Sequence, residues 1–185
     1  MEDNIMIRQA NIDDAPRIAE ILVFTKRMNY REIFQNDKVS FGEMLVYPLA
    51  KKYIDNPDEL DGIWVYDDEF VKGMIHIEEN QIVELYVDTF FEKQGIGTKL
   101  VEFAIQQMNC NFLWVLEKNI QAIKFYQRNG FVITDEKQYE EGTITEDDMT
   151  IDQMDALHKL YLGQIKELRE TLSRKLIDKS REWYK

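Results

Sequence analysis

The feature that most constrains this chain is an apolar run that leads to a glycine-containing turn and then to a helical pattern. The run covers residues 82–87, and the turn reads Gln94-Gly95-Ile96-Gly97-Thr98. From residue 100 to 108, apolar residues recur at helical spacing. The first amide groups of a helix have no partner within the helix, and the helix dipole favours negative charge there. Glycine also lets the backbone approach a ligand closely. The pattern therefore predicts a strand, a turn and a helix whose first turn binds an anion.

Two common phosphate-binding motifs are absent from the sequence. No Gly-x-x-x-x-Gly-Lys-Ser/Thr stretch occurs, so a P-loop is excluded. A dinucleotide-binding turn would need a third glycine near Leu100, and none stands there. The sequence therefore lacks the main motifs that would indicate nucleotide hydrolysis or hydride transfer. The alternative interpretation is that Gly95 and Gly97 only make a tight turn.

A second block adds weight to the glycine turn. Residues 119–131 read Asn-Ile-Gln-Ala-Ile-Lys-Phe-Tyr-Gln-Arg-Asn-Gly-Phe. The two blocks together resemble the GCN5-related N-acetyltransferase (GNAT) superfamily, which binds acetyl-coenzyme A. The family pattern Gln/Arg-x-x-Gly-x-Gly/Ala has its glycines at Gly95 and Gly97, but Glu92 stands where the family usually has Gln or Arg. The second family pattern is matched by Asn119, Ala122, Phe125, Tyr126, Gly130 and Phe131.

The resemblance implies acetyl-coenzyme A (acetyl-CoA) as co-substrate. By that resemblance, the backbone of the strand before the turn would pair with the pantetheine arm, and the Val87 N–H would stabilise the oxyanion. Asn119 would hydrogen-bond the same arm. The implied cofactor-binding residues are Leu85, Tyr86, Val87, Lys93, Gln94, Gly95, Ile96, Gly97, Thr98, Asn119, Ala122, Phe125 and Tyr126. Glu92 would repel a diphosphate, an effect that Lys93 and Lys99 partly offset.

Two residues are candidates for acid and base catalysis. Tyr126 lies two helical turns after Asn119 and therefore on the same face, and the resemblance implies that it protonates the departing thiolate. An amine with a pKa near 10.4 must lose a proton before it attacks, so a base is needed. Glu84 is the candidate base because it lies on the strand beside the expected thioester. Its alternative interpretation is an exposed strand carboxylate, and Glu78, Glu79 and Glu117 are further options.

The order of patterns along the chain predicts the fold class. Three strand patterns precede an alternation of strand and helix, which favours an α/β (α+β) fold with a mixed, mostly antiparallel central sheet flanked by helices. The resemblance implies the acyl-CoA N-acyltransferase fold for residues 1–151. Strands are expected at 5–9, 62–67, 70–79, 81–88, 112–116 and from 131, and helices at 40–54, 95–108, 119–129 and after Pro16.

The last part of the chain has a different pattern. From residue 152 to 185 there is no proline, and one apolar stripe recurs at helical spacing. We expect a long C-terminal amphipathic helix that extends from the 1–151 domain. Its apolar stripe must be buried against the domain, a second subunit or another partner. A homodimer through this helix is one hypothesis.

Charge and composition limit the partners. The formal net charge of −12 argues against nucleic acid, and no apolar run approaches the ~20 residues needed to span a membrane. Residues 55–92 hold twelve Asp or Glu and one Lys, which suits a cationic acceptor amine. A single cysteine, Cys110, fits a reducing compartment, so we expect a cytoplasmic protein. His76 and His158 have no Cys or His at metal-ligand spacing, so no metal site is expected.

These observations predict an N-acetyltransferase that moves an acetyl group from acetyl-CoA to a primary amine by direct attack in a ternary complex. The predicted acceptor is a small-molecule or peptide amine. The alternative is a non-catalytic acyl-CoA-binding or protein-interaction module on the same fold.

Overall fold

The computed structural model describes residues 6–34, 45–139 and 156–162. The chain divides after Cys110 into two compact units. We call the part up to Cys110 unit 1 and the part from Asn111 onward unit 2, and each is described by itself.

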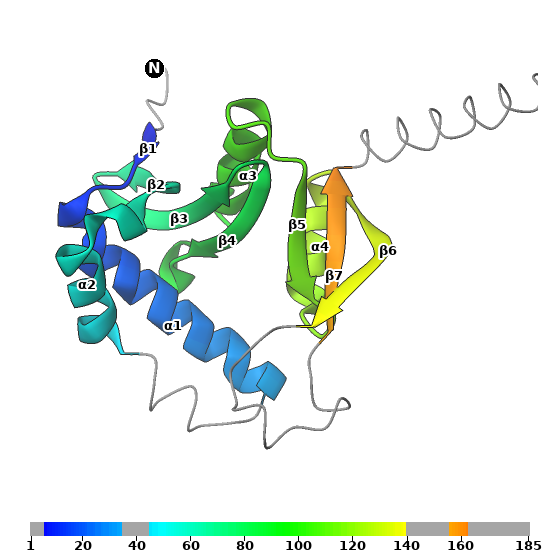
Figure 1. The fold of residues 1–185 in the computed structure, drawn as a ribbon, viewed down its shortest axis with the longest axis horizontal. Helices are drawn as coiled ribbons and strands as arrows, with labels where there is room; N and C mark the ends of the chain where they lie inside the picture. Colours follow the sequence, from blue (N-terminus) through cyan, green and yellow to red (C-terminus); the bar gives the residue numbers. More distant parts are fainter. Residues whose placement is uncertain (1–5, 35–44, 140–155, 163–185) are drawn as a thin grey trace, which may run out of the picture. The chain divides into compact units, whose positions relative to one another are not determined.

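The sheet of unit 1 is formed by four consecutive strands. They are β1 (Met6–Gln9), β2 (Ile63–Asp68), β3 (Phe70–Glu78) and β4 (Gln81–Val87), and each pairs antiparallel with the next. Three helices accompany them: α1 (Ala15–Phe34), α2 (Val46–Asp55) and α3 (Ile96–Gln106). Unit 1 also contains three short 3-10 helices: η1 (Ile12–Asp14), η3 (Pro57–Leu60) and η4 (Thr89–Phe91). Helices α1 and α2 lie side by side (Figure 1).

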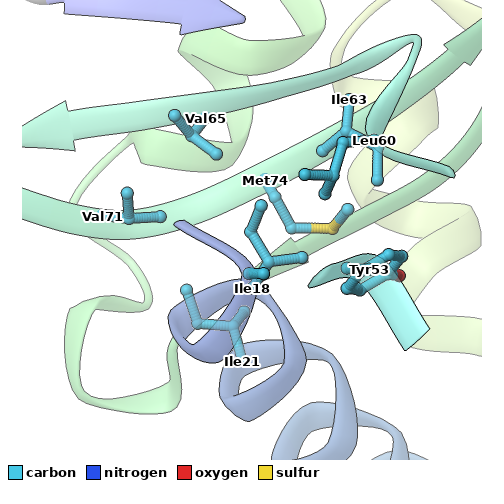
Figure 2. Packing of buried hydrophobic residues seen from close by; sticks show 9 residues of the cluster. Ile18, Ile21, Tyr53, Leu60, Ile63, Val65, Val71 and Met74 are labelled. Carbon is cyan, nitrogen blue, oxygen red and sulfur yellow. The ribbon is translucent and has the colours of Figure 1, made fainter. Parts of the chain in front are cut away.

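The helices of unit 1 cover both faces of the sheet. Successive side chains of a strand point to opposite faces. Met74 of β3 packs with Ile18 and Ile21 of α1 on one face, and Figure 2 shows these side chains turned toward one another. On the other face, a Cβ placed on Gly73 would lie 3.2 Å from Ile96 Cγ2 of α3. The core of unit 1 therefore consists of two layers, one under α1 and α2 and one under α3.

Helix-start chemistry explains where the first helices begin. The Asn11 side chain accepts the Asp13 N–H, and the Asp14 carboxylate accepts the Asn11 N–H, so η1 opens with a capping box. Pro48 falls in the first turn of α2, where a missing N–H costs no helical hydrogen bond. The predicted helix at 40–54 therefore starts later than expected, at Val46, and residues 40–44 lie outside the described residues.

Unit 2 contains three described strands and one helix. They are β5 (Phe112–Leu116), α4 (Ile120–Arg128), β6 (Phe131–Tyr139) and β7 (Ala156–Leu162). Strand β7 pairs antiparallel with both β5 and β6 and so lies between them. Gly130, with a φ of +90°, ends α4 and turns the chain into β6.

The expectation of helix from residue 152 is wrong for residues 156–162, which form β7. Leu160 is fully buried and stands opposite Leu113 of β5 and Ile133 of β6. Pairing with two strands satisfies the backbone on both sides, and this tertiary contribution outweighs the local helical spacing of the apolar residues. The strand also lies beyond the domain end predicted at residue 151. Residues 163–185 lie outside the described residues, so the C-terminal helix and the homodimer through it stay predictions.

The described residues lack both a membrane-spanning helix and a cluster of metal-binding side chains. Within ranges 6–34, 45–139 and 156–162, no helix is long and apolar enough to cross a membrane. The same ranges hold no group of three His, Cys, Asp or Glu side chains placed to bind a metal ion.

Candidate functional site

The glycine turn requires glycine for its backbone conformation. Gly95 is the N-cap of α3 and has a φ of +83°, in the left-handed region that residues with a Cβ rarely adopt. A Cβ added there would meet no atom within 4 Å, so crowding is not the reason for the glycine. Lys93, two residues earlier, also has a positive φ, of 61°. The chain therefore makes a tight reversal that leads directly into the first turn of α3.

The first amide groups of α3 have neither an acceptor in the helix nor a side-chain cap. Lys99 N–H donates to Gly95 O at 3.0 Å and is the first hydrogen bond of the helix. The N–H groups of residues 96–98 therefore have no acceptor within the helix. Asn11 caps η1 and Asn119 caps α4, whereas no described side chain caps α3 at Gly95 or α2 at Leu45. Lys93, Gln94 and Gly95 are exposed, Gly97 and Thr98 are half-buried, and Ile96 is buried, so the turn is open to solvent over residues 93–95.

The segment between β4 and α3 is anchored where it leaves the strand. The Asp88 carboxylate accepts the Phe90 N–H at 2.9 Å and forms an ion pair with Arg17 of α1. Arg17 Nε in turn donates to Val71 O of β3 at 2.9 Å. Further along, Gln94 Nε2 donates to Phe90 O at 3.4 Å. The turn is thus held by side chains at its start and is open at its end.

The charged side chains near the turn stand in two different surroundings. The Lys99 ammonium lies over the Tyr66 ring, 5.6 Å from its centroid, and the Tyr66 hydroxyl is 3.5 Å away. Glu92, the residue that departs from the family pattern, is exposed to solvent. Water screens an exposed carboxylate, so its repulsion of a bound anion is reduced.

Strand β4 presents different side chains to its two faces. Leu85 and Val87 stand opposite Ile75 and Gly73 of β3, on the face covered by α3. Glu84 and Tyr86 alternate with them and lie on the face toward α1. Tyr86 packs against the core cluster under α1, and Thr25 Oγ1 of α1 donates to Val87 O at 3.5 Å.

Glu84, the predicted base, is already paired. Its Oε1 accepts the Lys26 ammonium of α1 at 2.7 Å and the Tyr86 hydroxyl at 3.4 Å. The ammonium also lies 5.7 Å from the centroid of the Tyr86 ring. Tyr53 of α2 is buried, and burial together with the negative charges of Glu84 and Glu59 raises its pKa to about 12. Lys26 and Tyr53 were not predicted as site residues, because both come from helices that are distant from Glu84 along the chain.

The second predicted block forms α4 and its cap in unit 2. Asn119 Oδ1 accepts the Ala122 N–H at 3.0 Å, so the side-chain amide keeps its Nδ2 donors for another partner. Tyr126 is 8% exposed and packs edge-on against Phe125 and Phe131, with ring centroids 5.1 Å and 5.8 Å away. Its hydroxyl has no hydrogen-bond partner among the described residues. Burial raises the pKa of this hydroxyl, so it stays protonated at neutral pH.

The structure thus places the predicted site residues in two groups. Residues 84–87 and 93–98 lie in unit 1, on β4, the turn and the start of α3. Asn119, Ala122, Phe125 and Tyr126 lie together in unit 2, on α4 and its cap. The first group supplies backbone donors and a carboxylate, and the second supplies an amide and a buried phenol.

Comparisons with known proteins agree with the motifs. Residues 59–133 match the family model described as the acetyltransferase (GNAT) domain. The peptidyl-lysine N-acetyltransferase YiaC of Escherichia coli (strain K12) is 26% identical over 132 residues, which cover 70% of this chain and 85% of that protein. The predicted resemblance to the GNAT superfamily is therefore confirmed.

Solved structures agree with the predicted fold class. An N-acetyltransferase from Staphylococcus aureus Mu50 has a TM-score of 0.60 at 18% identity and covers 84% of this chain and 98% of its own. The PaiA N-acetyltransferase of Thermoplasma acidophilum, in complex with coenzyme A, has a TM-score of 0.51 at 18% identity, with the same two coverages. At these identities the likeness concerns the fold alone, and it confirms the predicted α/β class of strands flanked by helices.

Proposed function

We propose that this GNAT-type chain is an acetyl-CoA-dependent N-acetyltransferase that transfers the acetyl group to a primary amine by direct attack in a ternary complex. The observation that carries the proposal is the uncapped first turn of α3, entered through Gly95 in the left-handed conformation. A helix start whose first amide groups have no acceptor in the helix, next to the exposed residues 93–95, is suited to a diphosphate. The family match over residues 59–133, which include this turn, supports the same ligand.

The residues present fit coenzyme A at the turn. Residues 93–98 would hold its diphosphate through their N–H groups, with the Thr98 hydroxyl as a further donor. The backbone of residues 85–87 would hold the pantetheine arm as an added strand does, and Asn119 would donate from its Nδ2 to the same arm. When bound, acetyl-CoA supplies a thioester whose carbonyl an amine can attack.

Tyr126 is proposed as the acid. Its phenol is buried, protonated and without a hydrogen-bond partner among the described residues, so it can donate to an anion that forms beside it. A leaving thiolate is such an anion, since a free thiol has a pKa near 8.5. Glu84 is proposed as the base that accepts the proton of the attacking amine. In this role its carboxylate must exchange the Lys26 ammonium for the amine.

Turnover of acetyl-CoA with a panel of amines tests the proposal. Tyr126→Phe should lower turnover by about 10²-fold, the usual contribution of one acid–base group, and leave the dissociation constant for coenzyme A nearly unchanged. Tyr47→Phe removes the hydroxyl of an exposed tyrosine on α2 that has no role in this proposal; it is the control and should retain turnover. Equal turnover of Tyr126→Phe and wild type would remove Tyr126 from the acid role. If calorimetry shows no coenzyme A binding at millimolar concentration, the enzymatic proposal fails.

The second candidate function is a non-catalytic acyl-CoA-binding module. The observations that favour it are Glu92 in place of the family's Gln or Arg and the ion pair that occupies Glu84. This candidate predicts coenzyme A binding without turnover for any amine of the panel. Turnover that depends on Tyr126 would reject it.

A further inference from the structure

We infer that the Lys26 ammonium is an internal stand-in for the acceptor, so that Glu84 and Tyr86 form a binding site for an unbranched primary alkylammonium group. This inference rests on the proposed function, because it names the class of acceptor that the site on β4 takes. The inference goes beyond the proposed function because it assigns to Lys26 the role of an internal competitor for the acceptor amine.

The geometry around Lys26 Nζ is that of an ammonium site. One side of the ammonium meets the Glu84 carboxylate at 2.7 Å, and another faces the Tyr86 ring at 5.7 Å from the centroid. The side chains of Lys26 and Glu84 are only 20% and 26% exposed. A carboxylate next to an aromatic ring, both partly removed from water, is a combination that binds organic cations.

The groups packed around this pair are a tyrosine of α2 and a histidine of β3. The negative charge of Glu84 reaches Tyr53, where it adds to the effect of burial on the hydroxyl pKa. His76 of β3 stands opposite Glu84 in the strand register and is directed to Glu78, at 3.6 Å. Lys26 is therefore the one cation that the described contacts place on the Glu84 carboxylate.

The ligand class follows from the side chain that occupies the site. A lysine side chain ends in a compact ammonium on a flexible stem of four methylene groups. An external amine that carries the same group, such as a lysine side chain of a peptide or an aliphatic diamine, would make the same contacts with Glu84 and Tyr86. Because one ammonium replaces another, the Glu84 carboxylate keeps a partner throughout the exchange, and the displaced Lys26 ammonium must be hydrated by water instead.

Competition by Lys26 has a measurable size. Ion pairs with partial exposure contribute little, so an internal competitor of this kind weakens an external amine by about fivefold. Removal of the Lys26 charge should therefore improve amine binding, whereas removal of a merely structural ion pair would leave it unchanged or weaken it.

The experiment measures binding of n-butylamine at neutral pH, by calorimetry or NMR titration, without acetyl-CoA. Lys26→Met keeps the length of the side chain and should bind n-butylamine about fivefold more tightly than wild type. The double variant Lys26→Met/Glu84→Gln should lose this gain. The matched control is Lys51→Met, which removes an exposed lysine–carboxylate pair with Asp55 on α2 and should bind as wild type does. n-Butanol, which has the same stem without the charge, should not respond to any of these variants.

Several outcomes would overturn the inference. Equal or weaker binding of n-butylamine by Lys26→Met contradicts it, as does a gain that persists in the double variant. If Lys26→Met fails to fold by circular dichroism, Lys26→Gln provides the same comparison with a polar side chain. Because no step uses acetyl-CoA, a Glu84-dependent gain supports the amine site even if the transferase proposal fails. Turnover without such a gain supports the transferase and rejects this acceptor site.

Discussion

Unit 1 contains two candidate binding sites that are built in opposite ways. One is the glycine turn before α3, and the other is the Lys26–Glu84 cluster, formed by Lys26 of α1 with Glu84 and Tyr86 of β4. The turn consists of backbone N–H groups from one continuous segment, and no described side chain satisfies them. The cluster consists of side chains from α1 and β4, whose residues Lys26 and Glu84 are 58 positions apart, and these side chains already satisfy each other. A site built from one segment of backbone is thus open before its ligand arrives, whereas a site built from distant side chains holds an internal substitute.

This difference determines which substitutions should change ligand binding at each site. Backbone donors do not change with most substitutions, so the turn depends mainly on the conformation of Gly95. The cluster depends on which side chains are present and on their charge. Substitutions of three kinds should separate the two modes of construction, and they are given from the largest expected effect to the smallest.

Gly73 of β3 lies where both features can be damaged at once. A Cβ there would lie 3.1 Å from Tyr86 O of β4 and 3.2 Å from Ile96 Cγ2 at the start of α3. Gly73→Val should therefore lower the free energy of unfolding by roughly 3 kcal/mol, because a packed core resists overfilling. Urea unfolding measures this loss, and both coenzyme A and n-butylamine binding should decline together. Gly73→Ala is the graded control with a smaller loss, and a loss of only one binding activity would show that the two features are not coupled here.

Gly95 should affect the turn and spare the cluster. A β-branched residue at a φ of +83° is strained by about 1–2 kcal/mol, although no neighbouring atom obstructs it. Gly95→Val should raise the dissociation constant for coenzyme A by about tenfold and leave n-butylamine binding unchanged, as measured by calorimetry. Gly95→Asn is the matched control, since asparagine tolerates this conformation better. Equal coenzyme A affinity in Gly95→Val and wild type would show that the turn does not need its left-handed residue.

Acid titration should distinguish side-chain networks from backbone sites. Asp14 is nearly buried, which by itself would raise its pKa, but hydrogen bonds from Arg8 and the Asn11 N–H, with the Arg8 charge, lower it below 3.8. The folded state therefore binds this proton less tightly than the unfolded chain does. Its stabilising contribution is complete above about pH 4 and is lost as the pH falls through the lower folded-state pKa.

The measurement is urea unfolding of wild type and Asp14→Asn at about pH 7 and about pH 3. At about pH 7, wild type should be more stable than Asp14→Asn by ~1 kcal/mol, as expected for a hydrogen bond to a charged group. At about pH 3, this difference in the free energy of unfolding between the two proteins should be smaller. A difference that stays constant over this range would mean that Asp14 does not titrate differently in the folded and unfolded chains.

Local structure was predicted well from the sequence because it depends on residues that are neighbours along the chain. Strand β5 has the predicted bounds, 112–116, and α3 and α4 begin within one residue of the predicted starts. The glycine turn could be foreseen for the same reason: strand, glycines and helix are contiguous.

The parts that the sequence did not predict depend on partners distant along the chain. Nothing near Glu84 indicates that Lys26 occupies its carboxylate, since the ion pair forms only when α1 packs on β4. Strand β7 was predicted as helix because its apolar residues have helical spacing, whereas its conformation is decided by β5 and β6 on either side. Residues that cap or pair across elements need the fold before they can be assigned.

The position of β7 also fixes an order of assembly during synthesis. The strands of unit 1 are neighbours in the chain and pair in the order in which they leave the ribosome. Unit 2 cannot do this, because the strand that separates β5 from β6 is made last. Until residue 162 has emerged, β5 and β6 each have an edge without its native partner, and such edges are open to pairing with other nascent chains.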